Sequence, residues 1–110
     1  MLKTIFKNLD FMLVLDMRLK SVYKIPNGKL LKVFLDYDPE KNLIKKISIT
    51  GDFFVYPEET VELIEKELRG IRVDKDVLLS KIKSIIEREG IEFIGLDAEG
   101  LVEGIMLCVA

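Results

Sequence analysis

The chain lacks histidine altogether and contains one cysteine among its 110 residues. Histidine is the side chain that ordinarily changes charge near neutral pH, so its absence excludes His-based catalytic triads and zinc sites with His ligands. A lone cysteine, Cys108, cannot form an internal disulfide or a CxxC redox or metal motif. It lies in the apolar run GIMLCVA, which favours a buried side chain that takes no part in chemistry.

The chain also lacks the motifs by which enzymes hold phosphates or activate nucleophiles. No glycine-rich loop leads into a predicted helix with a Lys in register, as a phosphate cradle requires. Solvated turn and helix-cap positions explain the carboxylate pairs Asp36/Asp38 and Glu58/Glu59, and no serine has an evident base to activate it. The sequence therefore predicts no catalytic residue, no metal ligand and no cofactor bound by this chain alone.

Composition is that of one small globular domain. Hydrophobic residues make up 49% of the chain and charged residues 33%, and the formal net charge is −2. Lysine and glutamate are interspersed along the sequence, so no basic stripe marks a nucleic-acid site. We expect a cytoplasmic protein with neither nucleic acid nor a membrane among its partners.

The first sixteen residues, MLKTIFKNLDFMLVLD, are apolar but include Asp10 and Asp16 and no small-residue cleavage site. They do not match a signal peptide, and they are too short and too charged for a membrane span. Two interpretations stay open. Residues 1–16 form an amphipathic helix, as the spacing of their apolar side chains allows, or translation begins at Met17. Either way, we expect the domain itself to cover residues 17–110.

Alternating apolar residues predict three strands, at residues 19–25, 29–37 and 43–50. The PNG sequence at 26–28 predicts a tight turn in which Gly28 is free to take a positive φ, and DPEKN at 38–42 predicts a second loop. The apolar face of the later two strands consists of Leu31, Val33, Leu35, Tyr37, Leu43, Ile47 and Ile49. This pattern indicates a three-stranded antiparallel sheet whose apolar face needs a helical cover.

Helical patterns follow at residues 57–70, 74–90 and 97–110. Pro57 stands in the first turn of the first helix, whereas Asp74 and Asp97 can cap the second and third. Gly100 and Gly104 stand four residues apart in the third helix. That spacing indicates either close helix packing or plain tolerance of glycine near a chain end. The predicted fold class is therefore α+β, an antiparallel sheet covered by about three helices.

The stretch ITGDFFVYPEE, residues 49–59, holds three of the nine aromatic residues of the chain. Consecutive residues of an extended segment point to opposite sides, so Phe53 and Phe54 cannot easily share one core. Continuing the alternation of the preceding strand makes Phe53 the core residue and Phe54 the exposed one, although a bulge at Gly51 would reverse that order. We expect a partner surface to cover the exposed phenylalanine.

Two motifs in these stretches resemble the C-terminal accessory domain of lipoate–protein ligases. One is a G-K-L turn entering a strand pair, and the other a G-D-F-F turn that leads through Tyr-Pro to a helix. The motif residues, which we expect at a partner interface, are Gly28, Lys29, Gly51, Asp52, Phe53, Phe54, Tyr56 and Pro57. The resemblance covers residues 17–110 and implies a fold similar to that of sulfur-transfer and iron–sulfur scaffold proteins.

The resemblance also implies a function. The chain lacks the catalytic domain of the family, so it is similar to the separate small (beta) subunit of two-subunit ligases. Such an enzyme uses ATP, Mg²⁺ and lipoate to make lipoyl-AMP, then transfers the lipoyl group to a Lys of a lipoyl carrier domain. The implied partners are a catalytic subunit and, transiently, lipoyl carrier domains. The alternative is a freestanding module that binds a small molecule or protein unrelated to lipoylation.

Overall fold

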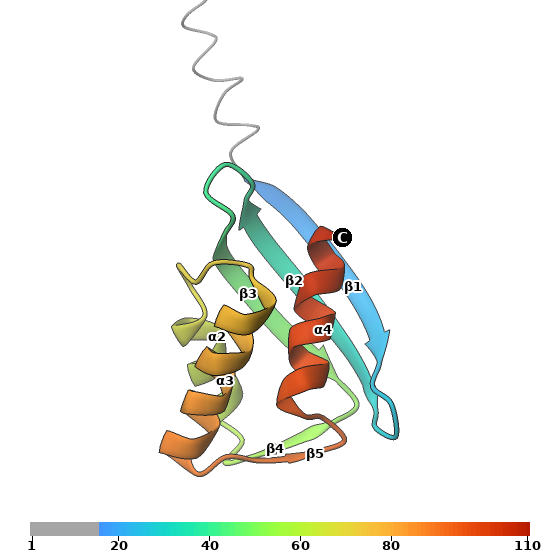
Figure 1. Ribbon diagram of the computed structural model, residues 1–110. Coiled ribbons are helices and arrows are strands. Elements are labelled where there is room, and N and C mark those ends of the chain that lie inside the picture. Colours follow the sequence, from blue (N-terminus) through green and yellow to red (C-terminus); the bar gives the residue numbers. More distant parts are fainter. Residues whose placement is uncertain (1–15) are drawn as a thin grey trace, which may run out of the picture.

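The computed structural model describes residues 16–110, and it confirms the α+β class (Figure 1). The strands of the main sheet are β1 Met17–Lys24, β2 Leu30–Asp38 and β3 Leu43–Gly51, antiparallel in the order β1-β2-β3. Two short strands, β4 Phe54–Tyr56 and β5 Glu92–Ile94, form a second antiparallel pair. The helices are α2 Thr60–Glu67, α3 Lys75–Glu89 and α4 Ala98–Val109. The helix or alternative start expected in residues 1–16 falls, apart from Asp16, outside the described residues.

All three helices lie on one face of the main sheet. Helix α4 lies against β1 and β2, α2 lies against β3, and α3 lies beside α4 (Figure 1). The core between these layers includes Leu31, Val33 and Leu35 of β2, which are buried as predicted because every second strand side chain points toward the helices. Within residues 16–110, no helix lies against the other face of the main sheet (Figure 1).

The prediction for the start of β3 is wrong by one residue. Ile44 is buried, whereas Leu43, the predicted core residue, is only partly buried. The pairing with β2 shifts beside Asp36, where Lys45 is left without a partner in the ladder. An extra residue of this kind reverses the alternation on one side of the bulge, so the side chain that reaches the core changes from Leu43 to Ile44.

The turn between β1 and β2 also differs from the prediction. The residue with positive φ is Asn27, at 59°, and not Gly28. Asparagine tolerates this left-handed conformation better than most residues with a side chain. Gly28 meets a different requirement, because a Cβ atom added to it would lie 2.8 Å from the carbonyl oxygen of Gly95.

The predicted caps of α3 and α4 are confirmed. The Asp74 carboxylate accepts a hydrogen bond from the backbone N–H of Val77 at 3.0 Å, and the Asp97 carboxylate accepts one from Gly100 at 2.6 Å. Helix α2 begins later than predicted, at Thr60, and Pro57 precedes it. Because residues 54–56 pair as strand β4, the chain must complete a turn before the helix can start.

The glycines of α4 allow the helix to pack closely on the sheet, which decides between the two interpretations of their spacing. A Cβ atom added to Gly104 would lie 2.6 Å from Cδ2 of Leu31 and 3.3 Å from Cγ2 of Val33. The carbonyl oxygen of Gly104 accepts a buried hydrogen bond from the Ser21 hydroxyl of β1 at 2.6 Å. Close contact thus joins α4 to two strands.

Candidate functional site

Strands β4 and β5 present an apolar patch at the end of the molecule opposite the C-terminus (Figure 1). Phe54 pairs with Ile94, and Tyr56 pairs with Glu92, so these side chains share one face of the strand pair. Phe54 is 61% exposed, Tyr56 52% and Ile94 48%. We name Phe54, Tyr56 and Ile94 the aromatic patch. Three large apolar side chains side by side on the surface are the pattern of an interaction site.

The opposite face of this strand pair anchors the patch to the core. Val55 is buried, and its partner Phe93 packs partly buried against the core cluster. Phe53, just before β4, also packs partly buried against that cluster. The predicted division, with Phe53 inside and Phe54 outside, is therefore confirmed for burial. The contact of Phe54 with a partner stays a prediction.

A hollow of about 300 Å³ adjoins the patch on the side of α2. Its lining residues are Phe53, Phe54, Val55, Tyr56, Glu58 and Val61. The patch therefore offers both projecting aromatic rings and a depression beside them, which suits a partner surface with an apolar side chain of its own.

Residues of both motifs lie beside β5 and hold the patch in place. The Lys29 N–H donates to the Gly95 carbonyl oxygen at 2.9 Å, which joins the turn after β1 to the end of β5. The Asp52 N–H donates to the Leu30 carbonyl oxygen at 3.0 Å, which joins the turn after β3 to the start of β2. Gly51 cannot be replaced there, because a Cβ atom would lie 2.2 Å from that same Leu30 oxygen.

Asp52 contributes to this turn through its backbone. Among residues 16–110 its carboxylate accepts no hydrogen bond across the turn, and its backbone N–H makes the contact instead. The glycines and Lys29 likewise contribute through backbone bonds and close approach. The motif residues thus build a hydrogen-bonded support, and the large apolar side chains that they leave exposed are those of Phe54 and Tyr56.

Titratable groups with shifted pKa values lie away from the patch. Arg88 of α3 donates two hydrogen bonds to the Glu67 carboxylate of α2, and the Lys81 ammonium lies 3.3 Å from it. These bonds hold the pKa of Glu67 below its ordinary value. They join α2 to α3. Burial raises the pKa of the Cys108 thiol, which lies in the core as predicted.

The described residues hold neither a metal-binding cluster nor a membrane-spanning helix. Within residues 16–110, no group of three or more Cys, Asp or Glu side chains is placed to hold a metal ion. In the same part of the chain, no helix is long and apolar enough to cross a bilayer.

Comparison with known proteins gives this arrangement a context. Residues 20–105 match the model of the family described as bacterial lipoate protein ligase C-terminus. The chain belongs to this family. The match spans both motifs, the aromatic patch and the strand pair that displays it.

A curated protein and a solved chain, both from Thermoplasma acidophilum, are similar to this member of the lipoate protein ligase C-terminal family. Lipoate-protein ligase A subunit 2 is 33% identical over 76 residues, which cover 69% of this chain and 76% of that protein. A solved chain from a structural analysis of an archaeal lipoylation system is 30% identical, with a TM-score of 0.70. The superposition covers 82% of this chain and 96% of that chain. That system is described as a bi-partite lipoate protein ligase and its E2 lipoyl domain.

One member of the aromatic patch, Ile94, was missed by sequence reasoning. The sequence alone assigns no element to Glu92–Ile94, because three residues are too few to establish an alternation. The glycine at position 95 could have indicated where this strand ends. Its φ of 82° is a conformation that favours glycine.

Proposed function

We propose that this chain is the non-catalytic accessory subunit of a two-part lipoate–protein ligase. In that assembly it contacts the catalytic subunit through the aromatic patch and is required for the activation of lipoate by ATP and Mg²⁺ to lipoyl-AMP. The catalytic subunit holds ATP, Mg²⁺ and lipoate, and the complex transfers the lipoyl group to a Lys of a lipoyl carrier domain. The observation that carries the proposal is the aromatic patch itself, built by the motifs of a ligase family.

The chemistry of the reaction explains what such a subunit contributes. Lipoyl-AMP is a mixed anhydride that water can hydrolyse, so a ligase gains by excluding solvent and ordering its mobile loops. A rigid apolar surface supplies both without a nucleophile or a general base. The patch meets this need because Val55 and Phe93 fix it to the core from behind, and Gly95 directly follows β5, where its carbonyl oxygen accepts a hydrogen bond from the Lys29 N–H.

The proposal is tested by a reconstitution of the adenylation step. Lipoyl-AMP formation from ATP, Mg²⁺ and lipoate is measured for this chain, for a ligase catalytic subunit from the same genome, and for their mixture. We expect product only from the mixture. Product from this chain alone, or equal product from the catalytic subunit alone, would refute the accessory role and favour the freestanding binding module.

A variant pair then tests the patch. Replacing both aromatic residues, Phe54→Ala with Tyr56→Ala, is expected to weaken subunit binding, while Leu107→Ala serves as the matched control. Leu107 is 44% exposed near the other end of α4, so its truncation removes a similar kind of surface elsewhere. If the control weakens the complex as much as the double variant, the patch is not the contact surface.

A further inference from the structure

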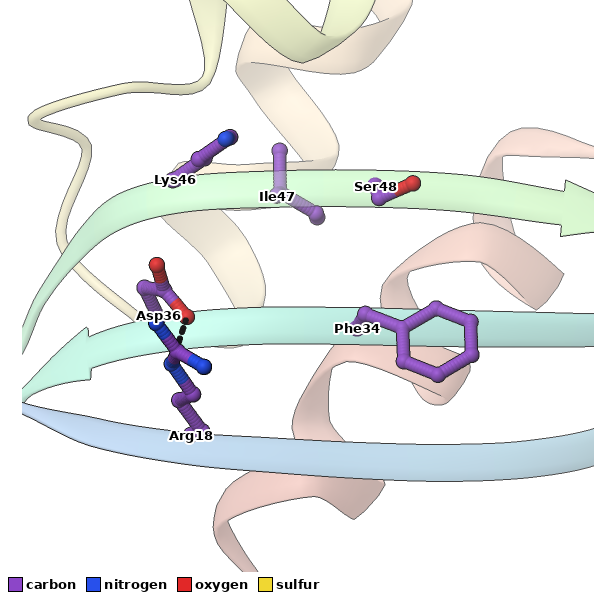
Figure 2. A pocket seen from close by; sticks show the side chains of 6 residues that line it. All are labelled: Arg18, Phe34, Asp36, Lys46, Ile47 and Ser48. Atoms are coloured by element: carbon purple, nitrogen blue, oxygen red, sulfur yellow. Dashed lines mark ion pairs between the residues drawn. The ribbon is translucent and has the colours of Figure 1, made fainter.

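The outer face of the main sheet, which no helix of residues 16–110 covers, is basic. Side chains that alternate away from the helices put Arg18, Lys20, Lys32 and Lys46 on this face, with Asp36 as the acidic residue among them. We name these five residues together with Phe34 the basic sheet face. Figure 2 shows part of it, with Arg18, Phe34, Asp36, Lys46 and Ser48 on three neighbouring strands and the helices behind them.

The charge of this face is opposite to that of the rest of the molecule. Residues 16–51 contain eight Lys and Arg against four Asp and Glu, whereas residues 52–110 contain seven against fourteen. The interspersed charges of the sequence had indicated no basic stripe. Strand alternation places the basic side chains together on the outer face, because residues two apart along a strand point to the same side. A net charge of −2 therefore conceals a basic sheet and an acidic helical layer.

An exposed aromatic ring lies at the centre of this face. Phe34 is 41% exposed, and the Lys20 ammonium lies over its ring at 5.4 Å from the centroid. Arg18 Nε lies 3.9 Å from Asp36 Oδ1, on one side of a hollow of about 340 Å³. By contrast, no carboxylate of residues 16–110 lies within 4.0 Å of the Lys32 or Lys46 ammonium. Those two lysines have charge to offer an incoming anion.

We infer that the basic sheet face docks an acidic protein surface, that of the lipoyl carrier domain which the proposed function requires as a substrate. The inference rests on the proposed function, and it assigns the two partners to different surfaces. A stable subunit contact favours buried apolar side chains, which the aromatic patch provides. A substrate protein must arrive and leave at each turnover, and charge complementarity gives fast association without tight binding. The basic sheet face, with the single ring of Phe34 among cationic side chains, suits such a transient contact.

The test compares two charge-reversed variants of equal net charge. The first is Lys32→Glu with Lys46→Glu on the basic sheet face, and the control is Lys41→Glu with Lys66→Glu on exposed positions elsewhere. Each is assembled with the catalytic subunit, and KM and kcat are measured with the purified carrier domain of the same organism over a range of ionic strength. Thermal melts establish that both variants fold.

We expect the first variant to raise KM for the carrier about tenfold, because each reversal replaces an attraction by a repulsion. Its KM should also no longer rise with salt as that of the unmodified complex does, since the attraction that salt screens has been replaced by a repulsion. The control should match the unmodified complex, and lipoyl-AMP formation should be the same in all three because the carrier is not involved in that step.

Three results would overturn the inference. An unchanged KM, or an equal rise in the control, would show that this face does not contact the carrier. A loss of lipoyl-AMP formation in the first variant would assign the face to the catalytic subunit. Binding of a fluorescein-labelled oligothymidylate that only the first variant loses, with KM unchanged, would assign it to nucleic acid. Failure of the proposed function is recognised separately, because then the unmodified mixture makes no lipoyl-AMP.

Discussion

Neighbouring phenylalanines with opposite surroundings allow a direct experiment on stability and binding. Phe53 packs partly buried against the core, whereas Phe54 is 61% exposed. Truncating a fully buried Phe costs about 3–5 kcal/mol of unfolding free energy. Since Phe53 keeps some exposure, we expect Phe53→Ala to cost about 2–3 kcal/mol, which lowers the melting temperature of a domain this size by about 10–20 °C. Phe54→Ala should change stability by no more than about 0.5 kcal/mol.

For binding to the catalytic subunit, we expect Phe54→Ala to have the larger effect and Phe53→Ala the smaller. If Phe54 is a hot spot of the subunit contact, its truncation weakens the complex by about 2 kcal/mol, which is roughly thirtyfold in Kd. Phe53→Ala, studied well below its melting temperature, should lose much less affinity, because Phe53 only lines the hollow beside the patch. The measurements are thermal melts followed by circular dichroism, and calorimetric titration of each variant with the catalytic subunit. If both variants lose stability equally and neither loses affinity once folded, the aromatic turn only fills the core and the reasoning is refuted.

Two further predictions concern stability alone. Gly104→Ala should lower the urea midpoint, because overpacking against the fully buried Leu31 costs about 1–3 kcal/mol and exceeds the helix-propensity gain of about 1 kcal/mol; a gain in stability would show that α4 can move away from the sheet. Glu67→Gln should be destabilising at pH 7. Because Arg88 and Lys81 lower the folded pKa of Glu67, its stabilisation is present above its unfolded pKa of about 4.3 and is lost as pH falls through the folded value. The free energies of unfolding of the wild type and the variant, from urea titrations, should therefore approach each other at more acidic pH. A difference between them that stays constant as the pH falls below about 4.3 would contradict this role of Glu67.

Local rules predicted the elements whose signals lie within a few residues. Apolar alternation established the three strands of the main sheet, since a strand with one buried face must repeat every second residue. Asp74 and Asp97 marked the starts of α3 and α4, because a carboxylate at that position accepts the N–H groups that the first turn leaves free. Both signals are physical requirements of the element itself, so they do not depend on the rest of the fold.

Features set by contacts between distant segments could not be predicted in this way. The bulge at Lys45 depends on how β3 pairs with β2, and it moved the core position from Leu43 to Ile44. The β4–β5 pair joins residues 54–56 to residues 92–94 across two helices, and each strand alone is too short to show a period. Gly28 correctly indicated a turn between β1 and β2. The reason that glycine is needed there is its close approach to Gly95, which directly follows β5 and is distant in the sequence.

The candidate site was nevertheless detectable, because it appeared as a conflict within the sequence. Two adjacent phenylalanines in an extended segment cannot both be buried in one core, and such conflicts between local pattern and global fold concentrate at functional positions. The basic sheet face gave no comparable signal, because its lysines are unremarkable one by one and acquire a common direction only when three strands pair. Surface chemistry of this second kind follows from strand register. It becomes visible in a sequence only after the inward and outward positions of every strand have been assigned and the pairing of the three strands is known.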